Sequence, residues 1–248
     1  MSLQTKPEIH GQNESIAPEY NERRKRKREI RDQEEAAYIL DDLRSGNRVL
    51  YLQEVPKVKV SHCRAWDCMP RRRTGEPIIR SYYRFALKGG TNLYGGERVE
   101  YYHISCFERI IPDLADLVRD ECLKMDGWIA APLDSKVTIE SSTKAIQDWF
   151  RYEGHAFDID CYERHKKDHD EWERNWSILQ IEHQLAHTGK PTEGCCLCEG
   201  VPEPKEPREM DYFPENPSAV SLSRLLAIVS GQPHIDKWWR WRNTGKEE

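Results

Sequence analysis

Four residues in the middle of the chain have side chains that could together bind a metal ion. Four residues separate Cys63 from Cys68 in HCRAWDCMP, and two separate His103 from Cys106 in YYHISCF. Three thiolates and one imidazole form the closed tetrahedral shell of a structural zinc site, with no open position for catalysis. Such ligands also disfavour Mg²⁺ and Ca²⁺. The spacing therefore predicts one Zn²⁺ held by these four residues, with His62 as a competing ligand beside Cys63.

A second group of ligand-type residues lies near the C-terminus. His183 and His187 are one helical turn apart, and Cys195, Cys196 and Cys198 follow within a Pro/Gly-rich stretch. A site of two His and two Cys is geometrically possible. The alternative is a surface His pair beside a Cys-rich loop, because Cys-Cys-x-Cys is not a usual zinc spacing. The sequence leaves both open.

The remaining cysteines and histidines have simpler interpretations. Cys122 and Cys161 are isolated, so we expect ordinary buried thiols. His165 and His169 are also one turn apart, but charged residues surround them, and we expect a solvated helix face.

The composition indicates a small folded centre. The 248 residues are 38% hydrophobic and 33% charged, with a mean hydropathy of -0.85, which is too polar for one large core. No run of eighteen apolar residues predicts a membrane span, and the first twenty residues do not resemble a secretory signal. The eight cysteines are therefore expected to stay reduced, which favours metal binding over disulfides.

The charge is distributed unevenly. Residues 57–98 contain ten Lys and Arg against three acidic residues, a net of +7 in a chain of net -5, and residues 99–248 carry -11. A local basic segment matters more for nucleic-acid binding than the overall charge does.

The elements that must position the ligands can also be predicted. Residues 48–60 and 78–87 are β-rich, the Gly-rich stretch 88–97 is a hairpin tip, and residues 98–104 form the returning strand. Apolar residues then recur with helical period from Phe107 to Cys122, which predicts one amphipathic helix of about four turns.

The flanks are less informative. We expect disorder in residues 1–21, then a helix from Glu22 to near Gly46 that begins with the basic run Arg23–Arg28. That run is a solvated helix face, a nuclear-import signal or a phosphate-binding arm, and import predicts a location in the nucleus.

Further helices are expected after residue 126. They cover residues 141–154, with Ser141 or Ser142 as the N-cap, then 167–187 and 221–231, and residues 190–209 form a linker.

The predicted fold class is α+β: a small zinc-stapled antiparallel sheet plus a helix, with mostly helical and partly disordered flanks. The corresponding regions are 1–47 (basic arm and helix), 48–126 (zinc module), 127–190 (helical) and 191–248 (linker and helical tail).

Residues 55–125 resemble the PARP-type zinc finger family. The likeness rests on the Cys pair, GEPIIRSYYRFAL, the Gly-rich turn and the ending GGERVEYYHISCFE. Two features depart from the family pattern: the first Cys pair has four intervening residues in place of two, and the stretch between the pairs is longer. The resemblance implies sequence-independent recognition of DNA breaks, nicks or ends, with roles in DNA repair.

The resemblance also implies particular contacts. Arg80 occupies the position of the family's phosphate-binding Arg, and Tyr94, Arg98 and Val99 lie near its base-stacking positions. The residues themselves agree in kind, because Lys and Arg bind phosphates and aromatic rings stack on unpaired bases. The expected DNA-binding set is Arg71, Arg72, Arg73, Arg80, Arg84, Tyr94 and Arg98. The alternative for Tyr82, Tyr83, Tyr101 and Tyr102 is strand core, with one of each pair buried.

No catalytic motif is present, which predicts a protein that is not an enzyme. Two functions remain. The first is a zinc-dependent protein that binds nicked or broken DNA. The second is an interaction adaptor of chromatin or DNA-repair complexes, in which zinc only holds the fold and the acidic, Trp-rich C-terminal half binds proteins.

Overall fold

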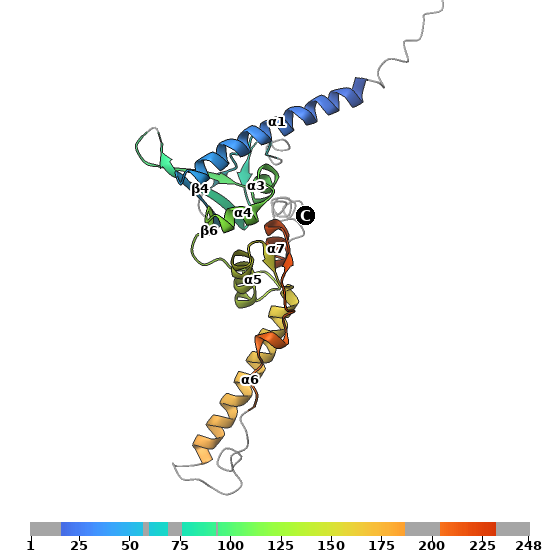
Figure 1. The fold of residues 1–248 in the computed structure, drawn as a ribbon. Helices are drawn as coiled ribbons and strands as arrows, with labels where there is room; N and C mark the ends of the chain where they lie inside the picture. Colours follow the sequence, from blue (N-terminus) through green and yellow to red (C-terminus); the bar gives the residue numbers. More distant parts are fainter. Residues whose placement is uncertain (1–15, 57–59, 69–75, 93, 187–203, 232–248) are drawn as a thin grey trace, which may run out of the picture.

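The structure is a computed structural model that describes residues 16–56, 60–68, 76–92, 94–186 and 204–231. Its centre is a four-stranded sheet in the order β5-β4-β1-β6 (Figure 1). The four strands are β1 (Arg48–Glu54), β4 (Tyr83–Thr91), β5 (Glu97–Tyr102) and β6 (Leu123–Met125). The first three pair antiparallel, whereas β6 pairs parallel to β1, a strand that the sequence did not predict.

Alternation along the strands explains why this sheet forms. In β1, Leu50 and Leu52 point into the core and are fully buried, as period-2 patterning requires. β1 begins opposite Gly89, whose φ is +119° and where a Cβ would lie 2.4 Å from the Asn47 carbonyl oxygen. Only glycine fits this approach.

The predicted helix over 107–122 is wrong in one respect, because it is two helices. They are α3 (Ile104–Ile110) and α4 (Leu114–Arg119). Pro112 lies between them and lacks the N–H that a continuous helix would need. Asp113 then accepts a hydrogen bond from the Asp116 N–H and begins α4.

The N-terminal helix α1 (Ile16–Arg44) begins six residues earlier than the sequence indicated. Residues 16–21 are therefore helical, which corrects the expected disorder there, and residues 1–15 lie outside the described part. Ile39 and Leu43 anchor α1 in the core. The helix ends just before Gly46, whose φ of +72° is typical of a helix terminus.

The C-terminal half is mostly helical. It contains α5 (Ile139–Arg151), α6 (Ile159–Ala186) and α7 (Leu222–Val229), a 3-10 turn (Glu209–Asp211), and the short strands β7 (His155–Ala156) and β8 (Ser218–Ala219). The N-cap of α5 is Thr138, which accepts a hydrogen bond from the Ser141 N–H, so Ser141 and Ser142 are not the cap. Both Ser side chains are buried inside the first turn.

The two halves share one apolar core. It extends from Phe107 of α3 to Ile146 of α5 and Leu226 of α7, and the Glu108 carboxylate accepts a hydrogen bond from the Ser223 N–H at 2.8 Å. The helix at 222–229, expected in a tail, therefore packs on the metal-ligand half.

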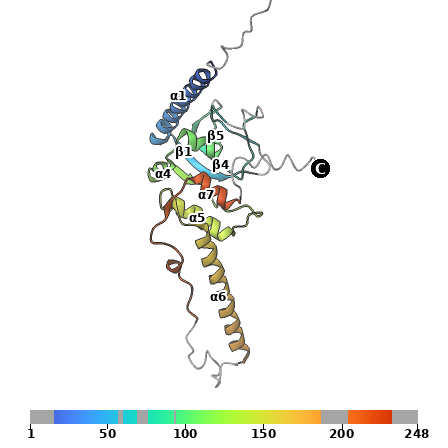
Figure 2. The same ribbon diagram turned by 90° about the vertical axis from the view of Figure 1, so that its right-hand side faces the viewer.

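Two long helices project from this body. α1 leaves at one end and α6 at the other, and both views show it (Figure 1, Figure 2). None of the helices in the described residues has the length and apolar character to cross a membrane. Within those residues the fold is mixed α/β, with a small antiparallel-rich sheet and six α-helices, which confirms the coarse fold class.

Candidate metal centre

Two short pieces of backbone bring the four predicted ligands together. The strand β2 (Ser61–His62) pairs with β3 (Ile78–Ile79), and Cys63 directly after β2 forms a bridge with Tyr101 of β5. Residues 63–68, here called the ligand loop, therefore lie beside the end of β5. His103 and Cys106 follow β5 at once, in the first turn of α3.

The ligand atoms converge on one point. One atom each from Cys63, Cys68, His103 and Cys106 lies within 4.8 Å of all the others, and all four residues are buried. The His103 Nδ1 atom lies 3.5 Å from the Cys68 sulfur and 3.8 Å from the Cys106 sulfur. The structure thus contains a buried cluster of three Cys and one His that could hold a metal ion.

These distances fit a tetrahedral ion. Bonds of about 2.3 Å to sulfur and about 2.0 Å to nitrogen place neighbouring S and N ligands about 3.5 Å apart at the tetrahedral angle. The S–N distances of 3.5 Å and 3.8 Å lie at or slightly above this value. The donor set therefore passes a geometric test as well as a chemical one.

Backbone groups around the cluster fix the orientation of its ligands. The His103 Nε2 atom lies 3.3 Å from the Ile78 carbonyl oxygen, so with a metal on Nδ1 the proton sits on Nε2 and is donated to Ile78. The His103 backbone N–H donates to the Cys63 sulfur at 3.4 Å. Such a bond favours the thiolate form of Cys63.

The thiols need a cation to ionise in this place. Burial, together with the neighbouring Cys106 and Cys68, raises the pKa of the Cys63 thiol far above its ordinary value of 9.0. A divalent ion reverses this effect because a coordinated thiol is deprotonated. Buried thiols this close together are therefore compatible with metal coordination.

His62 does not belong to the cluster. It lies on β2, where successive side chains point to opposite sides, and it is exposed whereas Ser61 and Cys63 are buried. The alternation of the strand therefore decides between the two possible ligands in favour of Cys63.

An aromatic group packs behind the centre. The Phe107 ring lies 5.1 Å from that of Phe85 and 5.3 Å from that of Tyr102. Tyr83 and Tyr102 are buried while Tyr82 and Tyr101 are only partly buried, which confirms that one of each Tyr pair belongs to the core.

The outer side of the ligand loop contacts α1. The Arg31 guanidinium lies over the Trp66 ring at 4.5 Å, the backbone N–H of Trp66 donates to the Glu35 carboxylate at 3.2 Å, and Arg28 pairs with Asp67 at 3.9 Å. Trp66 is nevertheless 58% exposed. The helix thus covers the ligand loop while leaving an Arg–Trp stack at the surface.

The same surface continues along β5. Arg98 donates to the Tyr38 hydroxyl at 3.3 Å, and both Arg98 and Arg64 lie near the same oxygen of Glu100. Tyr38, like Trp66, is more than half exposed. We call the group of Arg28, Arg31, Tyr38, Arg64, Trp66 and Arg98 the α1–β5 surface.

The carboxylate of Glu100, which pairs with two of these arginines, lies on the inner side of this surface. The Glu100 side chain is only 11% exposed, whereas those of Arg64 and Arg98 are 64% and 38% exposed. Burial alone would raise the pKa of Glu100, but hydrogen bonds from Arg48 and Arg98 outweigh it and hold that pKa below the ordinary 4.5. The cations therefore face solvent and the carboxylate faces inward.

The structure places the other predicted DNA contacts as follows. Arg80 is exposed between β3 and β4, and Tyr94 at the tip of the β4–β5 hairpin is 96% exposed. Arg84 is a correction: it is buried, its guanidinium donates to Gln53 and Ser61, and it stacks on Tyr101 at 3.9 Å. Strand alternation would place Arg84 on the face opposite Tyr83 and Phe85, but that face is also covered, and Arg84 is buried. Arg71, Arg72 and Arg73 lie outside the described residues.

Most of the second ligand-type group lies outside the described residues. Only His183 is described, on α6, so the possible site with His187, Cys195, Cys196 and Cys198 stays a prediction. Cys122 and Cys161 are buried thiols, as expected.

The expectation of a solvated face at His165 and His169 is wrong. Both are partly buried, His165 packs on the Tyr212 ring at 5.3 Å, and the His169 Nε2 atom lies 3.2 Å from a carboxylate oxygen of Glu206. The chain that returns along α6 covers this face, which the local sequence could not indicate. His169, Asp170 and Glu173 are also near enough to share an ion, but such groups are common on exposed helices without one.

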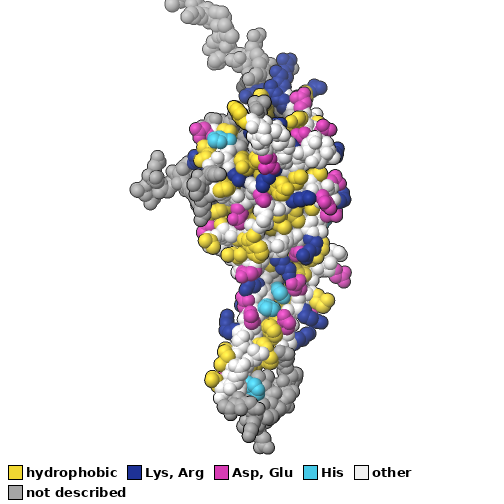
Figure 3. Space-filling model, turned by 90° about the vertical axis from the view of Figure 1, so that its left-hand side faces the viewer, with side chains coloured by type: hydrophobic (Ala, Val, Ile, Leu, Met, Phe, Trp, Pro, Cys, Tyr) yellow, Lys and Arg dark blue, Asp and Glu magenta, His cyan; other side chains and the backbone are white. Residues whose placement is uncertain are grey.

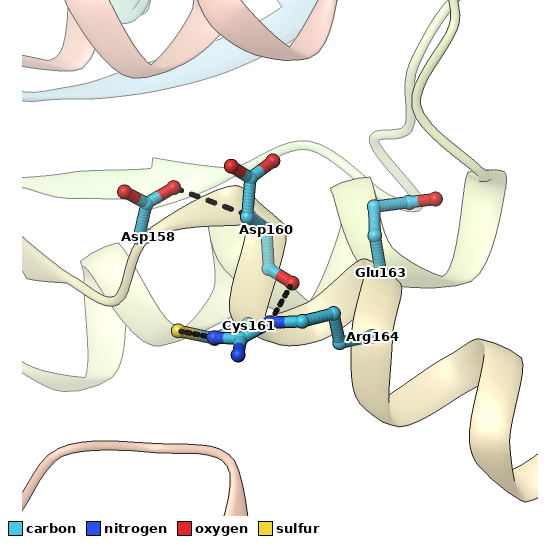
Figure 4. Close-up of a pocket in the computed structure, with 5 residues that line it drawn as sticks. All are labelled: Asp158, Asp160, Cys161, Glu163 and Arg164. Atoms are coloured by element: carbon cyan, nitrogen blue, oxygen red, sulfur yellow. Dashed lines mark hydrogen bonds between the residues drawn. The ribbon is translucent and has the colours of Figure 1, made fainter.

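A pocket of about 470 Å³ lies at the start of α6, away from the metal cluster. Figure 4 shows its lining residues, in which Asp158 accepts from the Asp160 N–H and Arg164 reaches the Cys161 sulfur. Glu163 is occupied by Thr138 at 2.9 Å. These side chains already form hydrogen bonds within the first turn of α6 and with Thr138, the N-cap of α5.

Sequence reasoning missed Trp66, Arg31 and Tyr38 as surface residues. Only Trp66 gave a weak signal. It lies between two predicted metal ligands, where a short loop has little room to bury a large ring, so exposure could have been expected. The two α1 residues gave no signal, since only the docking of the helix brings them to the loop.

Comparison of the chain with protein-family models, with curated proteins and with solved structures finds no match.

Proposed function

We propose that the cluster binds one Zn²⁺ and that the ion has a structural role. Three thiolates and one imidazole are the ligands of closed zinc sites, which leave no position for a substrate. The ion would join the ligand loop to α3 and β5, and its binding energy would stabilise this small module. We accordingly propose a binding protein without catalytic activity.

We further propose that the protein binds DNA at nicks, breaks or ends, independently of sequence. The α1–β5 surface carries this proposal: exposed or partly exposed arginines lie there beside two exposed aromatic rings, next to the ligand loop. Arginines bind phosphates of any sequence, and rings stack on unpaired bases. The resemblance of residues 55–125 to PARP-type fingers, whose members recognise broken DNA, supports the same function.

Two residues from the sequence prediction extend this surface. Arg80 would contact a backbone phosphate and Tyr94 an exposed base, since both side chains are exposed. Arg84 is left out because it is buried.

A specific observation favours the adaptor as second candidate. Ile178, Ile181 and Leu185 are 47%, 54% and 81% exposed on the projecting part of α6, and residues 99–248 carry a net charge of -11. An apolar stripe on an acidic half suits a protein partner better than DNA. In that case the metal would only hold the fold.

Binding of the full-length protein to a nicked duplex and to the same duplex intact separates the two candidates. We expect tighter binding to the nick, with affinity falling steeply as salt rises. Trp66→Ala should lower the preference for the nick by about 1–3 kcal/mol. Trp128→Ala is the matched control, because Trp128 is 67% exposed and follows β6 at the opposite edge of the sheet from β5.

Failure of the wild-type protein to bind either duplex at low salt would contradict the DNA proposal and favour the adaptor. Equal effects of the two Trp variants would contradict the role of the α1–β5 surface.

We also propose a nuclear location, directed by Arg23–Arg28, since their side chains are exposed or partly exposed. A fluorescent reporter fused to residues 1–45 should accumulate in nuclei. An even distribution between nucleus and cytoplasm would count against it.

A further inference from the structure

Residues 22–28 of α1 form a basic arm outside the body. Residues 22–28, ERRKRKR, contain six cations and one acid, and Arg23 to Lys27 are all exposed. Figure 1 and Figure 2 show this part of α1 extending beyond the sheet and α3. In Figure 3 the Lys and Arg side chains gather over α1 at the upper end of the molecule.

The arm is held in a fixed direction because the rest of α1 is anchored. Asp32 pairs with Arg109 of α3 at 3.1 Å, Asp42 lies 3.7 Å from the buried Arg48 of β1, and Ile39 is buried in the core. With the contacts to Trp66, these anchors follow one another at helical spacing from Arg28 to Asp42. A continuous helix transmits this orientation to residues 22–28.

Helical geometry divides the cations of the arm into two groups. At 100° per residue, Arg24 and Lys27 lie within about 40° of the direction of Arg31 and thus continue the line of the α1–β5 surface. Lys25 and Arg26 lie about 120–140° away, on other sides of the helix. One line of positive charge therefore runs from Arg24 to the Arg31–Trp66 stack.

We infer that this line binds the phosphate backbone of duplex DNA beside the break. The inference rests on the proposed function and adds to it the part of the DNA that is contacted. Seven residues of helix span about 10 Å, and a duplex rises 3.4 Å per pair. With Trp66 at the exposed base, Arg24 and Lys27 would lie along roughly the first three base pairs. Charge complementarity selects the occupant, because a run of six cations with sparse acids suits a polyanion.

Two charge-matched double variants of the full-length protein test this inference. Arg24→Gln with Lys27→Gln changes the aligned pair, and Lys25→Gln with Arg26→Gln changes the other pair. Each removes one Arg and one Lys from exposed positions, so the loss of long-range attraction is equal. Glutamine is a good helix former, and circular dichroism should show unchanged helix content.

The probe is a nicked 30-base-pair duplex titrated over a range of salt concentrations. The aligned variant should lose about tenfold or more in affinity. The slope of log affinity against log salt should become less steep by about 1.8, which corresponds to the loss of two phosphate contacts. The control variant should lose about twofold, with a smaller change in slope. Both variants should keep the preference for nicked over intact duplex that Trp66 provides.

The outcomes separate the two proposals. Binding by the wild type with equal losses in both variants overturns the arm and leaves break recognition standing. Absence of wild-type binding overturns both proposals. A reversed order, with the control variant weaker, would also overturn the arm, because the duplex would then lie on another side of α1.

Discussion

The metal-ligand half and the C-terminal half stabilise themselves by different means. In residues 16–126, four ligands converge on one point, the ion pair of Asp42 with Arg48 joins α1 to the sheet, and Arg48–Glu100 joins two strands within it. In residues 127–231 the contacts are between rings: Phe213 packs on Phe157 at 5.0 Å and on Tyr162 at 4.9 Å. Both halves contribute to the apolar core, but among the described residues only the first also brings three Cys and one His together in a buried cluster that could hold a metal ion.

The two halves meet at α3 and α7, but we expect a substitution in one half to leave the fold of the other intact. The hydrogen bond from Ser223 to Glu108 and the shared apolar core join them. Cys106→Ala and Trp149→Ala test how independent they are, and three further variants test single surface or buried side chains of the metal-ligand half.

The largest effect is expected from Cys106→Ala. It removes one ligand, and because metal binding and folding are one equilibrium, a stabilisation on the order of 10 kcal/mol is at stake. We expect the zinc content to fall from one ion per chain to none. The near-UV circular dichroism of the aromatic side chains packed around the cluster should decrease as well. Cys161→Ala, a buried thiol in the other half, is the control and should keep the ion. Equal zinc content in both variants would contradict the site.

A smaller loss should follow from Trp149→Ala in the C-terminal half. Trp149 is fully buried between α5 and α7 and donates to the Val220 carbonyl at 2.8 Å. Removing a core Trp costs about 3–5 kcal/mol, measured by urea unfolding. Zinc content should not change. If the metal were released at low denaturant, the halves would be one cooperative unit and the comparison would fail.

Glu35→Gln should have a small stabilising effect near neutral pH. Burial raises the pKa of the Glu35 carboxyl above its ordinary 4.5, and the hydrogen bond from Trp66 opposes this only in part. The folded state therefore favours the protonated form, so this group costs stability at neutral pH and the cost falls as pH drops toward 4.5. The amide can still accept from Trp66. We expect a gain of up to about 1 kcal/mol, and a flatter stability curve just above pH 4.5. An unchanged curve would contradict the assignment.

The hairpin tip should matter least for stability. Tyr94→Ala should change unfolding free energy by less than about 0.5 kcal/mol, because the side chain is exposed. It should lower the preference for nicked DNA by about 1–3 kcal/mol. Arg80→Gln should weaken binding to all sequences alike and reduce the salt slope by about one. Wild-type behaviour of both variants would restrict DNA binding to the α1–β5 surface.

Local pattern was sufficient for several features of the metal-ligand half. The ligand set follows from residue type and spacing, because few environments other than a metal site require three Cys and a His in close pairs. Strand alternation predicted that one Tyr of each pair is buried, and the structure shows that these are Tyr83 and Tyr102. The single helix expected from Phe107 to Cys122 was wrong because Pro112 interrupts a pattern whose apolar period continues through it.

Features made by distant contacts were not predictable. Arg84 looked like a surface cation, yet its neighbours across the sheet, Gln53 and Tyr101, bury it. His165 and His169 looked solvated until residues 206–212 covered them.

The sequence by itself determined which residues can bind the metal and which segments alternate or turn, since these depend on side-chain chemistry and short-range geometry. The tertiary structure alone decided that α1 lies on the ligand loop, that Trp66 and Tyr38 share a surface with four arginines, and that α7 packs on α3. The physical reason is separation along the chain. Ser223 and Glu108 are 115 positions apart, and a contact at that distance depends on the packing of every element between them.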